Sequence, residues 1–175
     1  MIFLLAAALL LASACKKDEI QVYRVAKPAD AVGAPVAGMM GSLSWPAPAG
    51  WTAKPGSGMR RATFVVPGAA GPGDLSVVSL PGDAGGPLAN VNRWRGQVGL
   101  PPWDEAALRA AAEPVSSPAG AFTVVDLPGA SQRMLAALLT RGGETWFFKL
   151  VGPDATVGAA KPAFKTFLSG VKPAG

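Results

Sequence analysis

Glycine and proline interrupt this chain so often that only short helices and strands fit between them. The 175 residues include 22 glycines and 17 prolines. Glycine weakens a regular element, and proline lacks the backbone N–H that helices and sheets use. Half of the residues are hydrophobic, so a core can still form between the interruptions. The length suits one domain with a single core.

Five of the uninterrupted segments are rich in β-branched and apolar residues and are predicted to be strands. They span residues 62–66, 75–80, 121–127, 132–141 and 144–152. Antiparallel pairing is expected for the first two. Gly142 and Gly143 should join the last two as a two-residue hairpin, because that turn needs positive φ at both positions. The segment 132–141 is apolar on both faces, which predicts an interior strand covered on both sides.

Three segments have the apolar spacing of helices. Residues 87–98 place their large apolar side chains on one stripe: Leu88, Val91, Trp94 and Val98. Gly99 then follows where a helix commonly ends. Asp104 is expected to cap a second short helix that stops before Pro114. The third helix carries Phe164, Phe167, Leu168 and Val171, and we expect its regular part to begin near Pro162, because proline is tolerated at the first helical position.

The predicted order is ββααβββα, an α+β fold with a single antiparallel β-sheet flanked by helices. This order, with "GW" early, "WFFKLVG" in the last strand and "FKTFLSGVK" near the end, resembles the PsbP-like superfamily. The run "LSVVSLPGDAGGPLANVNRWRGQVGLPP" resembles a family of uncharacterised lipoproteins from planctomycete-type bacteria. The resemblance covers about residues 45–172 and implies a PsbP-like domain over 45–175. It also implies a role as an adaptor or assembly factor, with no catalytic residues.

The first 14 residues, "MIFLLAAALLLASA", form an apolar run too short to span a bilayer permanently. They are predicted to be a signal peptide. "LLASAC" looks like a bacterial lipobox, so Cys15 is expected to carry the lipid, with residues 15–44 as a flexible tether. The alternative is a cleaved secretory peptide with an incidental cysteine. Lipidation would anchor the domain to a membrane of the cell envelope, facing the periplasm.

Several function classes lack the residues they need. The chain has no histidine and one cysteine, which removes the usual zinc ligands, the Ser-His and Cys-His nucleophiles and an internal disulfide. The net charge of +5 is spread along the chain without the basic stripe that nucleic acids require. No pair of carboxylates suggests an acid–base dyad. We therefore expect no enzyme, no cofactor, no metal site and no nucleic-acid partner.

The cluster "NVNRWRGQ" contains a candidate recognition site. On a helix, Asn90, Arg93 and Gln97 fall on one polar face, with Trp94 between that face and the apolar stripe. Arginine and tryptophan are enriched at interface hot spots, so these four residues form a candidate partner-binding site. The alternative is a solvated helix face with a core tryptophan. Arg95 lies on the opposite edge, where its head can reach water or a backbone carbonyl.

Two further features have a functional and a structural interpretation. Arg60 and Arg61 could face an anionic head group or partner, or could simply be solvated. The loop "PGDAGG" leads into a helix N-terminus and could hold an anion, or could be an ordinary turn.

These features favour a lipid-anchored protein that acts by binding, as an adaptor or assembly factor for an envelope protein complex. The alternative is a carrier of a small apolar or anionic ligand. The two differ at the core. A pocket lined by Trp94, Trp103 and Phe147 indicates a carrier, whereas a core filled by them beside an exposed Arg93 and Gln97 indicates an adaptor.

Overall fold

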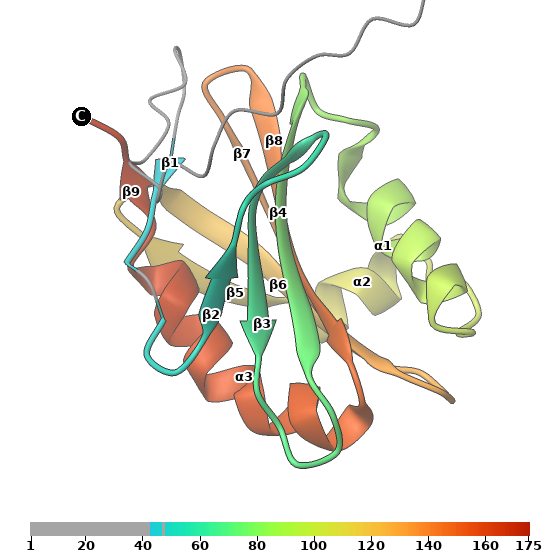
Figure 1. Ribbon diagram of the computed structural model, residues 1–175. Coiled ribbons are helices and arrows are strands. Elements are labelled where there is room, and N and C mark those ends of the chain that lie inside the picture. The colour runs from blue at the N-terminus through green and yellow to red at the C-terminus, as the bar shows by residue number, and fades with distance from the viewer. Residues whose placement is uncertain (1–42, 47) are drawn as a thin grey trace, which may run out of the picture. The chain divides into compact units, whose positions relative to one another are not determined.

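A computed structural model describes residues 43–46 and 48–175 of this chain (Figure 1). The predicted signal peptide, Cys15 and nearly all of the predicted tether lie outside these residues. The elements in chain order are β1 (Leu43–Ser44), β2 (Thr52–Lys54), β3 (Arg60–Val66), β4 (Gly73–Pro81), α1 (Gly86–Gln97), α2 (Glu105–Ala111), β5 (Glu113–Ser117), β6 (Gly120–Pro128), β7 (Arg133–Arg141), β8 (Glu144–Gly152), α3 (Asp154–Ser169) and β9 (Lys172–Pro173).

Strands β2 to β8 form one antiparallel sheet of seven strands, in the spatial order β2-β3-β4-β8-β7-β6-β5. The predicted fold class, α+β with one main antiparallel sheet and flanking helices, is therefore confirmed. Gly142 and Gly143 have φ of 60° and 77°, as the predicted hairpin between β7 and β8 requires. A separate pair, β1 with β9, joins the two ends of the described domain.

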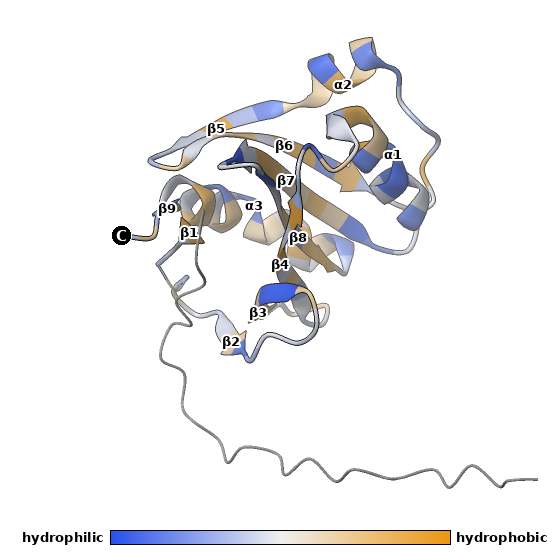
Figure 2. Cartoon of the chain, turned by 90° about the horizontal axis from the view of Figure 1, so that it is seen from above, coloured by the Kyte–Doolittle hydropathy of each residue, from blue (hydrophilic) through white to orange (hydrophobic). Residues whose placement is uncertain are grey.

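Helices cover the sheet on both faces, so the domain has two cores (Figure 2). Successive side chains of β8 point to opposite faces of the sheet and so enter different cores. Trp146, Phe148 and Leu150 face α3, whereas Phe147 faces α1 and α2. Strand β7 divides in the same way and is buried on both sides. This confirms the prediction that residues 132–141 form an interior strand.

Helix α3 differs from the prediction at its start. It begins at Asp154, and Pro162 lies inside it rather than at its first position. Proline is unfavourable there because it has no N–H to donate to the preceding turn. The earlier turns nevertheless stay helical because they bury Val157 and Ala160 in the α3-side core. Tertiary packing thus outweighs the local preference that the sequence signals.

Four strands were absent from the sequence-based expectation: β1, β2, β5 and β9. Strand β5 is the longest of them and contains Pro114, which argues against a central strand. It lies at the edge of the sheet, where Pro114 pairs in register with Thr123 of β6. Leu43 and Ser44, at the end of the predicted tether, form β1, and Leu43 is buried in the core.

Helices that could span a membrane are absent from the part of the chain that the structure describes.

Candidate functional site

The four residues predicted to form a recognition face on α1 separate into two pairs. Arg93 and Gln97 are exposed, as predicted. Asn90 and Trp94 are buried, with 2% and 4% of their surfaces exposed. The expectation that Asn90 faces solvent was wrong. Of the four residues, only Arg93 and Gln97 therefore lie on the exposed face of α1, and Asn90 and Trp94 lie buried beneath it.

Asn90 is buried because it holds the loop that leads into α1. That loop ends at Gly85, which has left-handed backbone and gives the helix no side-chain cap. The Asn90 amide Nδ2 instead donates to the carbonyls of Ala84 at 2.9 Å and Gly86 at 2.7 Å. Its Oδ1 accepts from Arg93 Nη1 at 3.1 Å. Asn90 thus acts on the exposed face indirectly, by orienting Arg93.

Trp94 fills the space between α1 and the sheet. Its ring packs edge to face against Phe147 of β8, with 5.7 Å between the ring centroids, and Phe147 is only 6% exposed. Trp103, which follows α1, lies under the Arg95 guanidinium, whose carbon is 3.8 Å from the indole centroid. Trp94, Trp103 and Phe147 are therefore packed side chains and do not line an open pocket.

Arg95 and Asn92 fasten α1 to the segment that precedes α2. Arg95 Nε donates to the carbonyl of Pro101 at 2.6 Å, which confirms that its head reaches a backbone carbonyl. Burial lowers the pKa of Arg95. Asn92 exchanges two hydrogen bonds with the backbone of Trp103, at 2.9 and 2.7 Å, and Asp104 caps α2 by accepting from Ala107 N at 2.8 Å. These contacts make α1 and α2 a fixed unit.

The sheet beside α1 carries a second cluster that the sequence reasoning missed. The core under α1 and α2 contains residues of β4, β6, β7 and β8 but none of β3, and β2 and β3 lie beyond the two helices (Figure 2). On this part of the sheet, strand register aligns Thr63 of β3, Ser76 of β4 and Lys149 of β8. Neighbouring side chains cover Thr63 and Ser76, which are both buried. A polar row thus crosses three strands and ends at a lysine on the central strand.

Lys149 is half-buried, and no other described residue forms an ion pair or hydrogen bond with its ammonium. Burial lowers its pKa, and the positive charges of Arg60 and Arg93 lower it further, while Asp74 acts in the opposite sense. We call the surface formed by Arg60, Asp74, Arg93 and Lys149, which lies over the buried Thr63 and Ser76, the basic sheet face. The sequence signal was a single lysine inside the apolar run "WFFKLVG", on the same side of the strand as Phe147.

The two adjacent arginines before β3 each have an acidic neighbour. Arg60 Nη1 donates to both carboxylate oxygens of Asp74, at 3.0 and 3.3 Å. Arg61 bonds Ser79 through Nε at 3.0 Å and lies 3.7 Å from Glu144. Arg60 belongs to the basic sheet face, whereas Arg61 is directed to the hairpin end of the sheet.

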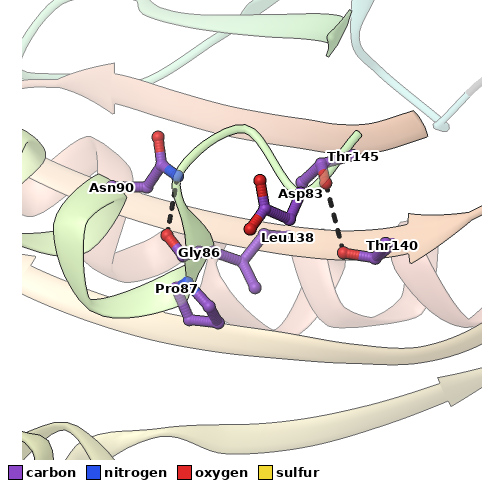
Figure 3. Close-up of a pocket in the computed structure, with 7 residues that line it drawn as sticks. All are labelled: Asp83, Gly86, Pro87, Asn90, Leu138, Thr140 and Thr145. Carbon is purple, nitrogen blue, oxygen red and sulfur yellow. Dashed lines mark hydrogen bonds between the residues drawn. The ribbon is translucent and has the colours of Figure 1, made fainter. Parts of the chain in front are cut away.

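A small cavity of about 50 Å³ lies at the start of α1 (Figure 3). Its lining residues are Asp83, Gly86, Pro87, Asn90, Leu138, Thr140 and Thr145. A water molecule takes about 30 Å³ of liquid volume, and ligand sites measure hundreds of Å³. The Asp83 carboxylate already accepts from Gly85 N at 3.2 Å. This hydrogen bond within the loop supports the interpretation of "PGDAGG" as a turn. The negative charge of Asp83 also argues against an anion site, because it would repel an incoming anion.

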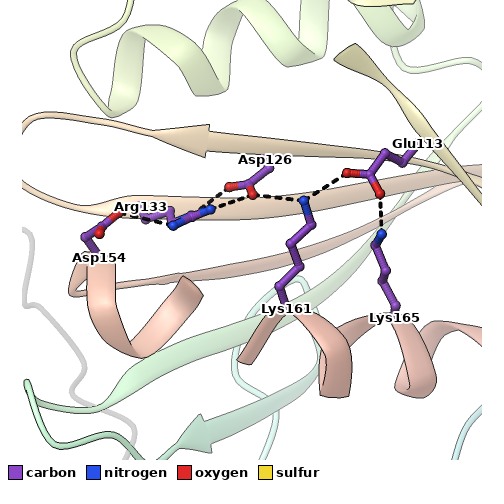
Figure 4. Close-up of polar contacts among 6 residues, drawn as sticks. All are labelled: Glu113, Asp126, Arg133, Asp154, Lys161 and Lys165. Carbon is purple, nitrogen blue, oxygen red and sulfur yellow. Dashed lines mark hydrogen bonds and ion pairs between the residues drawn. The ribbon is translucent and has the colours of Figure 1, made fainter. Parts of the chain in front are cut away.

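A network of ion pairs joins α3 to the strands on the other side of the sheet (Figure 4). Its members are Glu113, Asp126, Arg133, Asp154, Lys161 and Lys165. Lys161 Nζ bridges Glu113 at 2.8 Å and Asp126 at 3.1 Å, and Lys165 also contacts Glu113. Three acids balance three bases, so the network suits holding α3 in place better than recruiting a ligand.

Both carboxyl groups at the centre of this network have lowered pKa values. Burial raises the pKa of Asp126, but hydrogen bonds from Arg133 and Lys161 more than reverse that effect. Hydrogen bonds from Lys161 and Lys165 lower the pKa of Glu113. Both groups are therefore held as carboxylates, which makes them poor general acids. Nowhere in residues 43–46 and 48–175 do three His, Cys, Asp or Glu side chains gather as metal ligands.

Comparisons with known proteins give structural similarity without a family. No family model matches the sequence, and no curated protein matches it. The structure is similar to that of cyanobacterial PsbP (CyanoP) from Synechocystis, with a TM-score of 0.45 and 16% identity over 85% of this chain and 100% of that chain.

Two other solved structures are similar to a comparable degree. LpqN of Mycobacterium tuberculosis, which is described as involved in cell envelope biogenesis, has a TM-score of 0.43 and 14% identity, over 78% of this chain and 86% of that chain. A protein from Bacteroides thetaiotaomicron has a TM-score of 0.43 and 11% identity, over 76% of this chain and 45% of that chain. The α+β architecture rests on the strand pairings of the chain itself.

Proposed function

We propose that this chain is a lipid-anchored protein of the bacterial cell envelope whose domain acts by binding, as an adaptor or assembly factor, without catalysis. One observation carries the proposal. Arg93 and Gln97 are exposed on α1 directly beside Trp94, which fills the core against Phe147. This is the arrangement expected of an adaptor rather than of a carrier.

The contacts that fix α1 to the rest of the domain support a recognition role. Arg95 and Asn92 fasten the helix to the segment before α2 through Pro101 and Trp103. A rigid surface loses little conformational entropy on binding, which favours affinity. Arg93 is also held in place by Asn90, so its guanidinium is directed before a partner arrives.

The carrier alternative has less support. The aromatic side chains that would line its pocket are packed against one another, and the cavity at the start of α1 has room for about one or two water molecules. A ligand of ordinary size needs several hundred Å³.

Anchoring depends on Cys15. Mass spectrometry of the mature protein should find Cys15 as the first residue with fatty acyl chains attached. A mature chain that lacks Cys15, or carries it without acyl chains, would refute the anchored form of the proposal.

The binding face is tested with the full-length protein extracted from envelopes in detergent. We expect Arg93→Glu to lose the partners that the unchanged protein recovers in pull-down. Arg109→Glu is the matched control, because Arg109 is also a helical arginine and its side chain is 72% exposed. Equal recovery by the unchanged protein and the Arg93 variant would refute a role for the α1 face.

A further inference from the structure

We propose that the basic sheet face binds the carboxylates of an acidic segment of a partner protein, with Lys149, Arg60 and Arg93 as the cationic contacts. This inference rests on the binding function proposed above and names the chemistry of the partner. It also moves the centre of the site from the exposed face of α1 to the sheet beside it.

The position of Lys149 is the first argument. Its strand is the middle one of seven, and its neighbours across the ladders are Ser76 and Ala136. Neighbouring side chains cover its aliphatic stem, while its ammonium still reaches solvent and can bind an anion. No described residue supplies that anion. A carboxylate bound here would provide it.

The surrounding charge is the second argument. The Arg93 guanidinium has a neutral partner, Asn90 Oδ1, at 3.1 Å. Arg60 is paired with Asp74, but both are substantially exposed, at 40% and 51% of their side chains, so the pair is open to exchange with an incoming acid. The three cations outnumber the single carboxylate. The lowered pKa of Lys149 is consistent with this excess of positive charge.

The shape of the surface favours a protein segment over a lipid bilayer. Lys149 lies on the sheet, whereas Arg93 belongs to α1, a helix about 10 Å wide that rises next to it. A flat membrane surface that rests on α1 would not reach the Lys149 ammonium beside the helix. An extended peptide can lie along the sheet instead, and the half-buried Val65 and Val78 supply apolar contact on the same face as Thr63 and Ser76.

The test measures binding of a defined acidic probe to the full-length protein in a non-ionic detergent. The probe is capped pentaglutamate, and capped pentaglutamine is its uncharged match. Reductive ¹³C-methylation of lysines gives an NMR signal for each ammonium, and the Lys149 signal is assigned by its loss in Lys149→Met. We expect pentaglutamate, and not pentaglutamine, to shift the Lys149 signal and raise its pKa. An unshifted Lys149 signal at saturating probe would overturn the inference.

Affinity provides the second readout. Lys149→Met should weaken pentaglutamate binding about tenfold, the value of a hydrogen bond to a charged group. Lys54→Met removes the same charge from the exposed strand β2 and should leave the dissociation constant within about twofold, because exposed charges are screened by salt. Equal losses in the two variants would mean non-specific attraction and would overturn the inference.

Inorganic phosphate and an anionic lipid head group also carry oxyanions, and each is tested separately. Inorganic phosphate that displaces pentaglutamate at equal concentration would indicate a free-anion site. A Lys149 signal that shifts more in detergent micelles mixed with phosphatidylglycerol than in micelles mixed with phosphatidylcholine would indicate a membrane contact. Either outcome would overturn the proposed protein partner, whereas the absence of both effects supports it.

Folding is controlled in parallel. Lys149→Met should keep its thermal midpoint, because it removes a charge without a described partner. Arg93→Gln alters an exposed helix position and should raise the dissociation constant of pentaglutamate about threefold, as expected of a partly screened charge.

The outcomes that refute the two proposals are different. Loss of the pentaglutamate effect with Arg93-dependent partners retained refutes only the sheet-face site. Retained pentaglutamate binding with Arg93-independent partners refutes the proposed adaptor surface.

Discussion

Asp126 on β6 and Arg133 on β7 form a two-point ion pair. Arg133 Nε donates to Asp126 Oδ1 and Nη2 donates to Oδ2, both at 2.7 Å. The two side chains are 18% and 22% exposed. Such a paired geometry is stronger than a single contact. Lys161 of α3 adds a further bond to the same carboxylate at 3.1 Å, so Asp126 connects the sheet to the C-terminal helix.

The first prediction concerns acid stability. The folded-state pKa values of Asp126 and Glu113 lie below their ordinary values. The stability that these groups contribute is therefore complete above about pH 5 and is lost as pH falls through the ordinary carboxyl range, near 4, toward the lowered values. Urea unfolding between pH 7 and pH 3 should show this decline. Asp126→Asn should flatten it and cost about 2 kcal/mol at pH 7, since the pair is only partly exposed. An unchanged slope in the variant would contradict the assignment.

The second prediction concerns the contact between Arg95 and Trp103. Arg95→Met keeps an apolar stem but removes the cation over the indole ring and the hydrogen bond to Pro101. We expect a loss of about 1–3 kcal/mol in the free energy of unfolding. Arg93→Met on the exposed side of the same helix is the control and should change stability by less than about 0.5 kcal/mol. The summed fluorescence of the five tryptophans during urea titration measures the stability of both variants. Equal stability of the two variants would show that the contact contributes nothing.

The third prediction concerns the proline inside α3. Pro162 is exposed, so Pro162→Ala loses little packing and restores a backbone N–H within the helix. We expect the free energy of unfolding to rise by about 1–3 kcal/mol. Pro87, at the first turn of α1, is the comparison, and Pro87→Ala should be close to neutral because no intrahelical bond is missing there. Thermal unfolding followed by circular dichroism measures the midpoint of each variant. A lower midpoint for the Pro162 variant would mean that the proline fits its site.

The fourth prediction compares two glycines. A Cβ at Gly129 would lie 2.2 Å from the carbonyl oxygen of Val98 and 2.7 Å from its Cβ, so Gly129→Ala must displace backbone. It should cost about 1–3 kcal/mol, as overpacking does. A Cβ at Gly96 meets nothing within 4 Å, and Gly96→Ala in the last turn of α1 should stabilise the protein by up to about 1 kcal/mol. Opposite shifts of the urea midpoint are expected, and shifts of the same sign would refute the contrast.

Local signals in the sequence determined most of the elements. Gly142 and Gly143 predicted the hairpin because their freedom to adopt positive φ is a property of the residues alone. Asp104 predicted the start of α2 because a capping carboxylate acts within one turn. The apolar periodicity of 87–98 located α1, and the two apolar faces of 132–141 identified an interior strand. Each of these signals operates over a few residues.

Tertiary structure decided what those signals leave open. Pro162 is tolerated in mid-helix because Val157 and Ala160, five and two residues earlier, are buried in the core. Asn90 is buried because its amide donates hydrogen bonds to the carbonyls of Ala84 and Gly86 in the segment that leads into α1. Lys149 became a candidate contact only when register placed it beside Ser76, near Arg60 and Arg93. Burial and charge proximity depend on residues that are distant in sequence, so a site composed of such residues becomes visible only in the folded chain.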